Sequence, residues 1–181
     1  MKLWLLRHAQ PLIDTGICYG AMDVAADKVA TDAAAMSFAQ LVPKSLTVLT
    51  SPLQRCEQLA QALKGLRPDL TVRQDIRLAE MDFGCWEGVR WAAIGQEAFD
   101  PWMADFGSYC FGGRESVNML MHRVAAVLQE ARTLDTEVIW ITHAGVIHAA
   151  TLIAHGTQQL THADQWPKEA PAFGAWCQIE L

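Results

Sequence analysis

The sequence predicts an α/β fold: a three-layer α/β/α sandwich with a mostly parallel sheet and an antiparallel strand at one edge. Short apolar runs alternate with helical patterns along the chain, as is typical of α/β proteins. The first run, Leu3–Leu6, is continuously apolar, which suits a central strand buried on both faces. A chain of 181 residues suits one domain, so we expect residues 1–181 to form a single unit.

The other elements follow from the same patterns. Further strands are expected at Leu46–Leu49, Leu70–Val72, Val138–Ile141 and, at an edge, within Ala172–Leu181; helices are expected from Thr31 to near Pro43, Ser51 to about Lys64, Glu115 to Arg132 and about Val146 to Ala154. Ser51 and Pro52 look like a helix N-cap and first helical position, and Gly65 like the end of that helix. Residues 83–114 are rich in Gly and aromatic residues and show little periodicity, so we expect a lid or pocket wall there.

The third of these helices has the clearest amphipathic pattern. Its apolar stripe consists of Val117, Leu120, Met121, Val124, Val127 and Leu128. We expect this stripe to pack on the sheet.

Composition narrows the class of partner. The net charge of −6 argues against nucleic acid, because phosphate backbones favour basic proteins. No apolar stretch approaches the ~20 residues of a membrane helix, and the apolar start is too short for a signal peptide, so we expect a cytoplasmic protein without a membrane partner. Five cysteines without a CxxC pair predict reduced thiols. The sequence leaves open whether the protein forms a homo-oligomer.

Reactive residues follow three of the expected strands. Arg7 and His8 follow the first strand, Arg55 lies one helical turn after the second, and His143 follows the strand at Val138–Ile141. Because the carboxyl ends of parallel strands line one crevice, these side chains are expected to meet there.

This set of residues suits phosphoryl transfer. Arginine matches phosphate with a planar, permanently charged fork, and backbone N–H groups at a helix start near Ala144 add donors. A neutral His8 can attack phosphorus. The leaving oxygen needs an acid, for which we choose Glu80; Glu57, Asp82 and Glu87 are nearby alternatives.

The motifs resemble the histidine phosphatase superfamily, in its phosphoglycerate mutase-like branch. The matching segments are Leu6–His8, Ser51–Ala60, Leu78–Gly88 and Thr142–Gly145, in the family's order. The resemblance implies that His8 becomes phosphorylated, that Arg7, Arg55 and His143 hold the phosphate, and that Glu80 donates the proton. It implies no metal or other cofactor.

A narrower resemblance concerns the substrate, a small phosphate ester. Gly16–Gly20 with Asp23-Val24, Trp86–Trp91 and Gly112–Ser116 look like α-ribazole phosphatases of cobalamin synthesis, which implies α-ribazole 5′-phosphate. Gln10, Tyr19 and Gly20, with Ala144, are the further expected substrate contacts. The sequence departs from the family pattern at Ala9, Gln10-Pro11 and Arg114. The alternatives are a broad-specificity phosphatase, a mutase-like enzyme and a non-catalytic phosphate-ester sensor.

Other chemically able residues have simpler interpretations. His148 and His155 are seven residues apart, which is no usual metal-ligand spacing, so we expect structural or surface roles. The aromatic residues Trp86, Trp91, Trp102 and Tyr109 are equally compatible with a platform for a base or sugar and with an ordinary core. Cys18 is not expected to be a nucleophile, since nothing nearby predicts a lowered thiol pKa.

Overall fold

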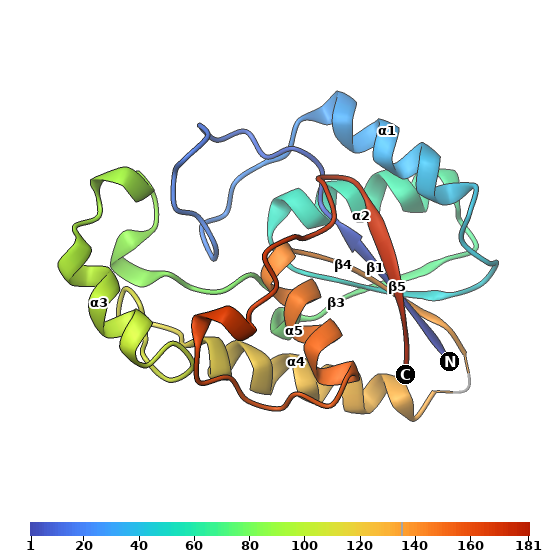
Figure 1. Cartoon of the computed structure of the whole chain (residues 1–181). Helices are drawn as coiled ribbons and strands as arrows, with labels where there is room; N and C mark the ends of the chain where they lie inside the picture. Colours follow the sequence, from blue (N-terminus) through green and yellow to red (C-terminus); the bar gives the residue numbers. More distant parts are fainter. Residues whose placement is uncertain (135) are drawn as a thin grey trace.

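The strands form one sheet in the order β3-β2-β4-β1-β5 (Figure 1). In the computed structural model, which describes residues 1–134 and 136–181, the strands are β1 (Lys2–Arg7), β2 (Thr47–Thr50), β3 (Thr71–Gln74), β4 (Val138–Thr142) and β5 (Trp176–Glu180). The strands β3, β2, β4 and β1 run parallel, and β5 pairs antiparallel with β1 at the edge. The expected mostly parallel sheet with an antiparallel edge strand is confirmed.

Helices cover both faces of this sheet (Figure 1). The helices α1 (Lys28–Ala39) and α2 (Gln54–Leu66) lie on one face, and α4 (Val117–Arg132) and α5 (Ala144–Ala154) on the other. Leu3 and Leu5 of β1 belong to the core beneath α4 and α5, whereas Trp4 and Leu6 belong to the core beneath α1 and α2. Successive side chains of a strand point to opposite faces, so a continuous apolar run is what this position requires.

The amphipathic stripe of α4 packs as its sequence predicts. All six stripe residues are buried in the core between this helix and the sheet. Ser116 caps the helix, because its side chain accepts a hydrogen bond from the backbone N–H of Met119 at 3.2 Å.

The predicted start of α2 is wrong. Ser51 does not cap the helix, which begins at Gln54 after Leu53. The free N–H of Gln54 donates instead to the carboxylate of Asp23, 2.7 Å away in a distant loop. Such a cap cannot be read from local sequence, since the capping oxygen comes from a segment 31 residues upstream.

Two further helix limits differ from expectation. Gly65 lies inside α2, which continues to Leu66; Pro68 disfavours a helical conformation at Arg67 and so ends the helix there. The helix α1 begins at Lys28 rather than Thr31, because the side chain of Asp27 accepts the N–H of Ala30 at 2.8 Å.

Residues 83–114 are more regular than the sequence suggests. They contain the helix α3 (Gln96–Ala104) and the short 3₁₀ helices Gly84–Trp86 and Trp91–Ala93. Further 3₁₀ turns are Ile76–Leu78 and Ala163–Gln165. The segment extends away from the sheet, at the left of Figure 1. No helix of the described residues is long and apolar enough to span a membrane.

Candidate active site

The three strands that precede the reactive residues are neighbours in the sheet. Because β2, β4 and β1 lie side by side and parallel, their carboxyl ends meet at one edge. The rings of His8 and His143 are 5.1 Å apart there, and the Nε–H of Arg55 donates to Nδ1 of His143 at 3.2 Å. The structure thus brings together side chains that are up to 135 positions apart in sequence.

His8 is held in the form that a nucleophile needs. Its Nδ1 lies 2.8 Å from the carbonyl oxygen of Ala9, which can only accept, so Nδ1 carries the proton and Nε2 keeps its lone pair. Burial and the charges of Arg55 and Arg7 lower the pKa of His8 to about 3, so the ring is neutral near pH 7. Among the described non-glycine residues only Ser45 has a positive φ, so Ala9, where the sequence departs from the family pattern, has no left-handed backbone strain.

Arg7 is oriented by the chain that leads into β5. Its Nη1–H donates to the carbonyl of Pro171 at 2.8 Å, and its guanidinium lies 4.0 Å from the centroid of the Phe173 ring. The same phenyl ring lies 5.5 Å from His8. The buried Nε of Arg7 has no hydrogen-bond partner among the residues that the structure describes. Sequence reasoning missed Phe173, which follows no recognisable motif.

Arg55 is fully buried and held by backbone oxygens. Its Nη1 and Nη2 donate to the carbonyls of Met22 and Gly20 at 2.8 and 2.6 Å. A guanidinium has five N–H groups, so one N–H on each terminal nitrogen remains for a ligand. The ring of Tyr19 lies 5.3 Å from the guanidinium carbon, and burial raises the pKa of its hydroxyl. Tyr19 and Gly20, both expected substrate contacts, therefore lie against Arg55.

His143 is engaged through both ring nitrogens. Because Nδ1 accepts from Arg55, the proton lies on Nε2, which donates to Oγ of Ser51 at 2.8 Å. The thiol of Cys56 lies 3.4 Å from the same Nε2. Burial and the charge of Arg55 hold the pKa of His143 well below its usual value. Ser51, expected to cap α2, instead accepts the Nε2–H of this histidine.

Glu80 reaches the start of α5. Its two carboxylate oxygens accept the backbone N–H groups of Gly145 and Met81, each at 3.0 Å. A Cβ at Gly145 would collide with the Glu80 carboxylate, so glycine is needed for this approach.

The alternative acids lie in other settings. The carboxylate of Glu87 accepts four backbone N–H groups, from Gly20, Ala21, Met22 and Phe83, which occupies it structurally. Asp82 accepts the N–H of Gly84 and lies 3.8 Å from exposed Arg114, and Glu57 pairs with Gln74 at the surface. Among these carboxylates, Glu80 is the one at the helix start beside His143.

The segment that carries Glu80 is clamped from α4. The guanidinium of Arg123 donates to the carbonyls of Arg77 and Ala79 at 2.6 Å each and to that of Glu80 at 3.2 Å. Glu115 holds this guanidinium through a 2.7 Å ion pair. The sequence offered no signal for this role, since Arg123 looks like any arginine of an amphipathic helix.

The remaining candidates lie around the site. Gln10 is exposed beside a hollow of about 170 Å³ that Tyr19 and Phe173 also line. Cys18 is fully buried, and burial raises its pKa to about 12, so it stays a thiol. His155 is exposed, whereas His148 lines a cavity together with Ala144.

The aromatic residues split between the two interpretations. Trp86 and Trp91 stack on the buried ring of Phe111 and belong to the core of the insert. Tyr109 is exposed. Trp102 stacks on Phe111 with its ring centroid 4.3 Å away and also lines the cavity beside Glu80.

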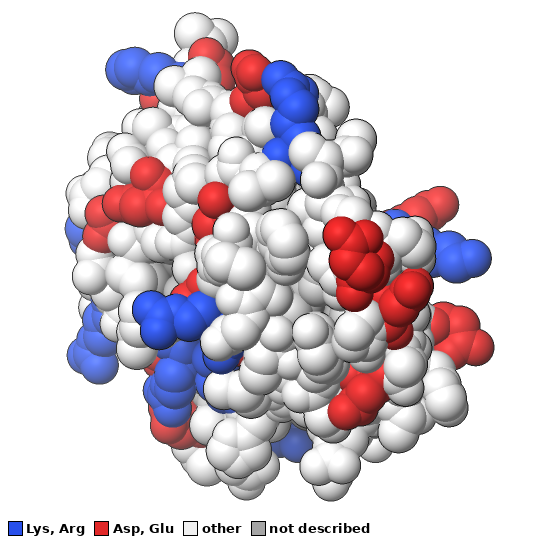
Figure 2. Space-filling model, turned by 90° about the vertical axis from the view of Figure 1, so that its left-hand side faces the viewer, with Lys and Arg blue, Asp and Glu red and all other residues white. Residues whose placement is uncertain are grey.

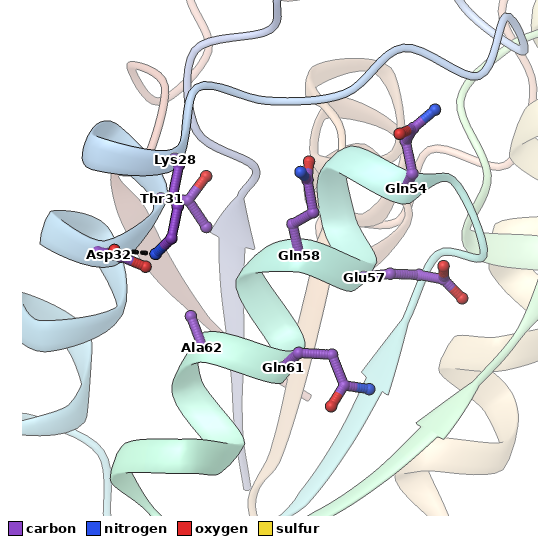
Figure 3. A pocket seen from close by; sticks show the side chains of 8 residues that line it. All are labelled: Lys28, Thr31, Asp32, Gln54, Glu57, Gln58, Gln61 and Ala62. Carbon is purple, nitrogen blue, oxygen red and sulfur yellow. Dashed lines mark hydrogen bonds and ion pairs between the residues drawn. The ribbon is translucent and has the colours of Figure 1, made fainter.

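A separate polar hollow of about 450 Å³ lies between α1 and α2 (Figure 3). Lys28, Thr31 and Asp32 of α1 face the glutamine side chains of α2 across it, and an ion pair joins Lys28 to Asp32 (Figure 3). Glu57, one of the alternatives to Glu80, lines this hollow, whereas His8, His143, Arg7, Arg55 and Glu80 do not. Within residues 1–134 and 136–181, no three His, Cys, Asp or Glu side chains gather as a group that could hold a metal ion.

Comparison with known proteins places this geometry in a family. Residues 3–171 match the model of the "Histidine phosphatase superfamily (branch 1)". No curated protein matches the chain. Among solved structures, a mycobacterial glucosyl-3-phosphoglycerate phosphatase is 25% identical with a TM-score of 0.81, covering 98% of this chain and 88% of its own.

Two other structures share the fold. One protein from Thermus thermophilus is 25% identical with a TM-score of 0.74, over 99% of this chain and 94% of that chain. A protein described as mycobacterial hydrolase 2 is 24% identical with a TM-score of 0.82, over 98% of this chain and 80% of that chain. Since the family model spans most of the sequence, the chain belongs to the histidine phosphatase superfamily, branch 1, and is a phosphoric monoester hydrolase.

Proposed function

We propose that the chain hydrolyses a small phosphate monoester in two steps, with His8 as the covalent phosphoryl acceptor. The observation that carries this proposal is the hydrogen bond from Nδ1 of His8 to the carbonyl of Ala9, since it leaves a neutral Nε2 with a free lone pair. The free N–H groups of Arg7 and Arg55 are the donors that would neutralise the non-bridging oxygens.

In the first step, Nε2 of His8 bonds to phosphorus as the bond from phosphorus to the leaving oxygen breaks. Glu80, protonated, gives its proton to that oxygen, and the alcohol departs. In the second step, water attacks phosphorus, Glu80 takes a proton from the water, and the bond from Nε2 to phosphorus breaks, which releases inorganic phosphate. No step requires a metal ion.

The test is to trap the intermediate. Rapid acid-free quenching of the enzyme with a ³²P-labelled aryl phosphate should yield label that survives base and is lost in acid, as expected of phosphohistidine. His8→Ala should give neither label nor turnover, whereas the exposed His155→Ala should behave as the parent, and a chelator should change nothing. Turnover by His8→Ala would contradict the mechanism, and so would loss of the parent enzyme's activity on addition of a chelator.

We further propose α-ribazole 5′-phosphate as the physiological substrate. Its support is the sequence resemblance together with the position of the motifs. The carbonyl of Gly20 accepts a hydrogen bond from Arg55, and the carboxylate of Glu87 accepts backbone N–H groups of the same loop. The measurement is kcat/KM for this ester beside glucosyl-3-phosphoglycerate, 3-phosphoglycerate and an aryl phosphate. A preference for glucosyl-3-phosphoglycerate or 3-phosphoglycerate would overturn the assignment. A requirement for a bisphosphorylated cofactor would indicate a mutase, and binding of the ester without turnover would indicate a sensor.

A further inference from the structure

An apolar cavity of about 270 Å³ lies beside Glu80, between α5, α4 and the insert 83–114. Its lining includes Glu80, Gly145 at the start of α5, His148 one helical turn along that helix, and Trp166. The volume lies just below the usual range for small-molecule sites. The candidate acid is therefore part of the cavity wall.

The walls of this cavity are apolar and flat. Val117 and Leu120 of α4 line it, as do Trp102 and Phe106 of the insert. The two insert rings are stacked, with centroids 5.5 Å apart and planes at 16°. Because neither lysine nor arginine is among the lining residues, the cavity offers nothing to balance an anionic ligand.

Two polar atoms of the lining residues are buried without a hydrogen-bond partner among the described residues. They are Nε1 of Trp102 and Nδ1 of His148. Nε2 of His148 lies 2.9 Å from the carbonyl of Glu169 and so carries the proton, which leaves Nδ1 an acceptor; indole N–H is a donor only. Buried polar groups are rarely left unpaired, and a ligand in the cavity is one source of the missing acceptor and donor.

Figure 2 shows the molecule from the side that carries the insert. The middle of this face is largely uncharged, and acidic and basic side chains stand mostly around it (Figure 2).

We propose that this cavity binds the leaving alcohol of the substrate, and that it selects an uncharged, flat ring system whose ring atom accepts a hydrogen bond from Trp102. The inference rests on the proposed function, since Glu80 must protonate the leaving oxygen and thereby places the alcohol on its own side of the phosphorus. Carboxylated alcohols such as glycerate are excluded by the lining, and α-ribazole is one member of the class selected.

The test uses two isosteric esters, 1-naphthyl phosphate and quinolin-5-yl phosphate, which differ by one ring nitrogen. The parent enzyme should hydrolyse both at least tenfold more efficiently than 3-phosphoglycerate, measured as kcat/KM. Trp102→Phe keeps the stacked ring and loses the N–H, so it should lower the ratio of quinolinyl to naphthyl turnover by about five- to tenfold, as loss of one hydrogen bond predicts.

A second variant tests the volume independently. Val117→Phe fills the cavity and should lower kcat/KM for the fused-ring esters at least tenfold while retaining hydrolysis of methyl phosphate. Ala62→Phe, in the polar hollow between α1 and α2, is the matched control and should change neither. The melting temperature of each variant shows whether it folds; if Val117→Phe does not, the Trp102→Phe ratio decides alone.

The two proposals fail in different ways. If the parent hydrolyses none of the esters and forms no phosphohistidine, the proposed function is wrong. If it hydrolyses them all but treats 3-phosphoglycerate and naphthyl phosphate alike, or if Trp102→Phe leaves the quinolinyl to naphthyl ratio unchanged, the assignment of the cavity is overturned while the phosphatase mechanism stands.

Discussion

The Nε–H of Arg55 donates to Nδ1 of His143 at 3.2 Å, and this one contact sets the protonation of the whole histidine. The proton that Nδ1 cannot carry must lie on Nε2, where Ser51 accepts it. Both ring nitrogens are thus used inside the protein. The resemblance implied that His143 holds the phosphate; in this geometry its Nε2–H must leave Ser51 to do so, or it acts by orienting Arg55.

Ser51→Ala should destabilise the protein and slow turnover. The variant leaves the buried Nε2–H of His143 without its oxygen acceptor, which costs about 1–3 kcal/mol of unfolding free energy. Urea unfolding and kcat measure the two effects. Ser51→Thr retains a hydroxyl and should recover most of both, whereas Thr151→Ala, which removes a hydroxyl from α5, should leave kcat unchanged. Full activity of Ser51→Ala would show that the hydrogen bond between His143 and Ser51 has no part in turnover.

Gly145→Ala should reduce kcat with little loss of stability. The added Cβ would collide with the Glu80 carboxylate, which is the end of a flexible side chain and can move aside. Displacing the acid should lower kcat by up to about 10²–10⁴-fold, the usual contribution of general acid catalysis. Gly65→Ala on the exposed side of α2, where a Cβ meets nothing within 4 Å, is the control for stability and rate. Unchanged kcat in Gly145→Ala would remove Glu80 from the proton-donor role.

Arg123→Met should lower both stability and kcat. It removes the donor from three backbone carbonyls and the cation that pairs with Glu115, which costs about 3 kcal/mol for a largely buried pair. Because the freed segment carries Glu80, kcat should fall more than KM changes. Lys28→Met breaks only an exposed pair on α1 and should leave kcat as it was. An Arg123→Met enzyme with parental kcat would show that the clamp is structural only.

The protein should lose stability as the pH falls from about 6.5 towards 3. The pKa of His8 is lowered to about 3 in the folded state, whereas a histidine in the unfolded chain titrates near 6.5. Between these values the unfolded state binds more protons, so the unfolding free energy rises with pH, by up to about 1.4 kcal/mol per pH unit for this group. Urea unfolding of His8→Asn should show a shallower pH dependence than that of the exposed His155→Asn. Equal slopes would contradict the buried neutral state of His8.

The sequence predicts the sheet and the strand-end residues well because both follow local rules. An apolar run such as Leu3–Leu6 favours a strand buried on both faces, and the polar residue after such a strand lies at the crevice. His8, Arg55 and His143 were found by this logic and lie together. The predicted start of α2 was wrong for the opposite reason, because the oxygen that caps the helix belongs to Asp23, which is distant in sequence.

The supporting residues of the site could not be predicted because their partners are distant and chemically ordinary. Arg123 binds carbonyl groups, which every residue has, so no residue type marks its target. The role of His148 depends on a cavity formed by three separate elements, and its spacing from His155 carries no information about it. Ala144 and His148 are four residues apart on α5, which could have indicated a shared face.

The contact of Arg7 with Pro171 joins residues 164 positions apart, and Phe173 completes the wall behind the nucleophile. During synthesis on a ribosome, the wall of the phosphate site therefore emerges long after the histidine that it supports. We expect a nascent chain to hydrolyse no ester until residues 171–174 have emerged and docked beside Arg7 and His8. Any fusion that keeps residues 171–174 from docking would inactivate the enzyme without touching a catalytic side chain.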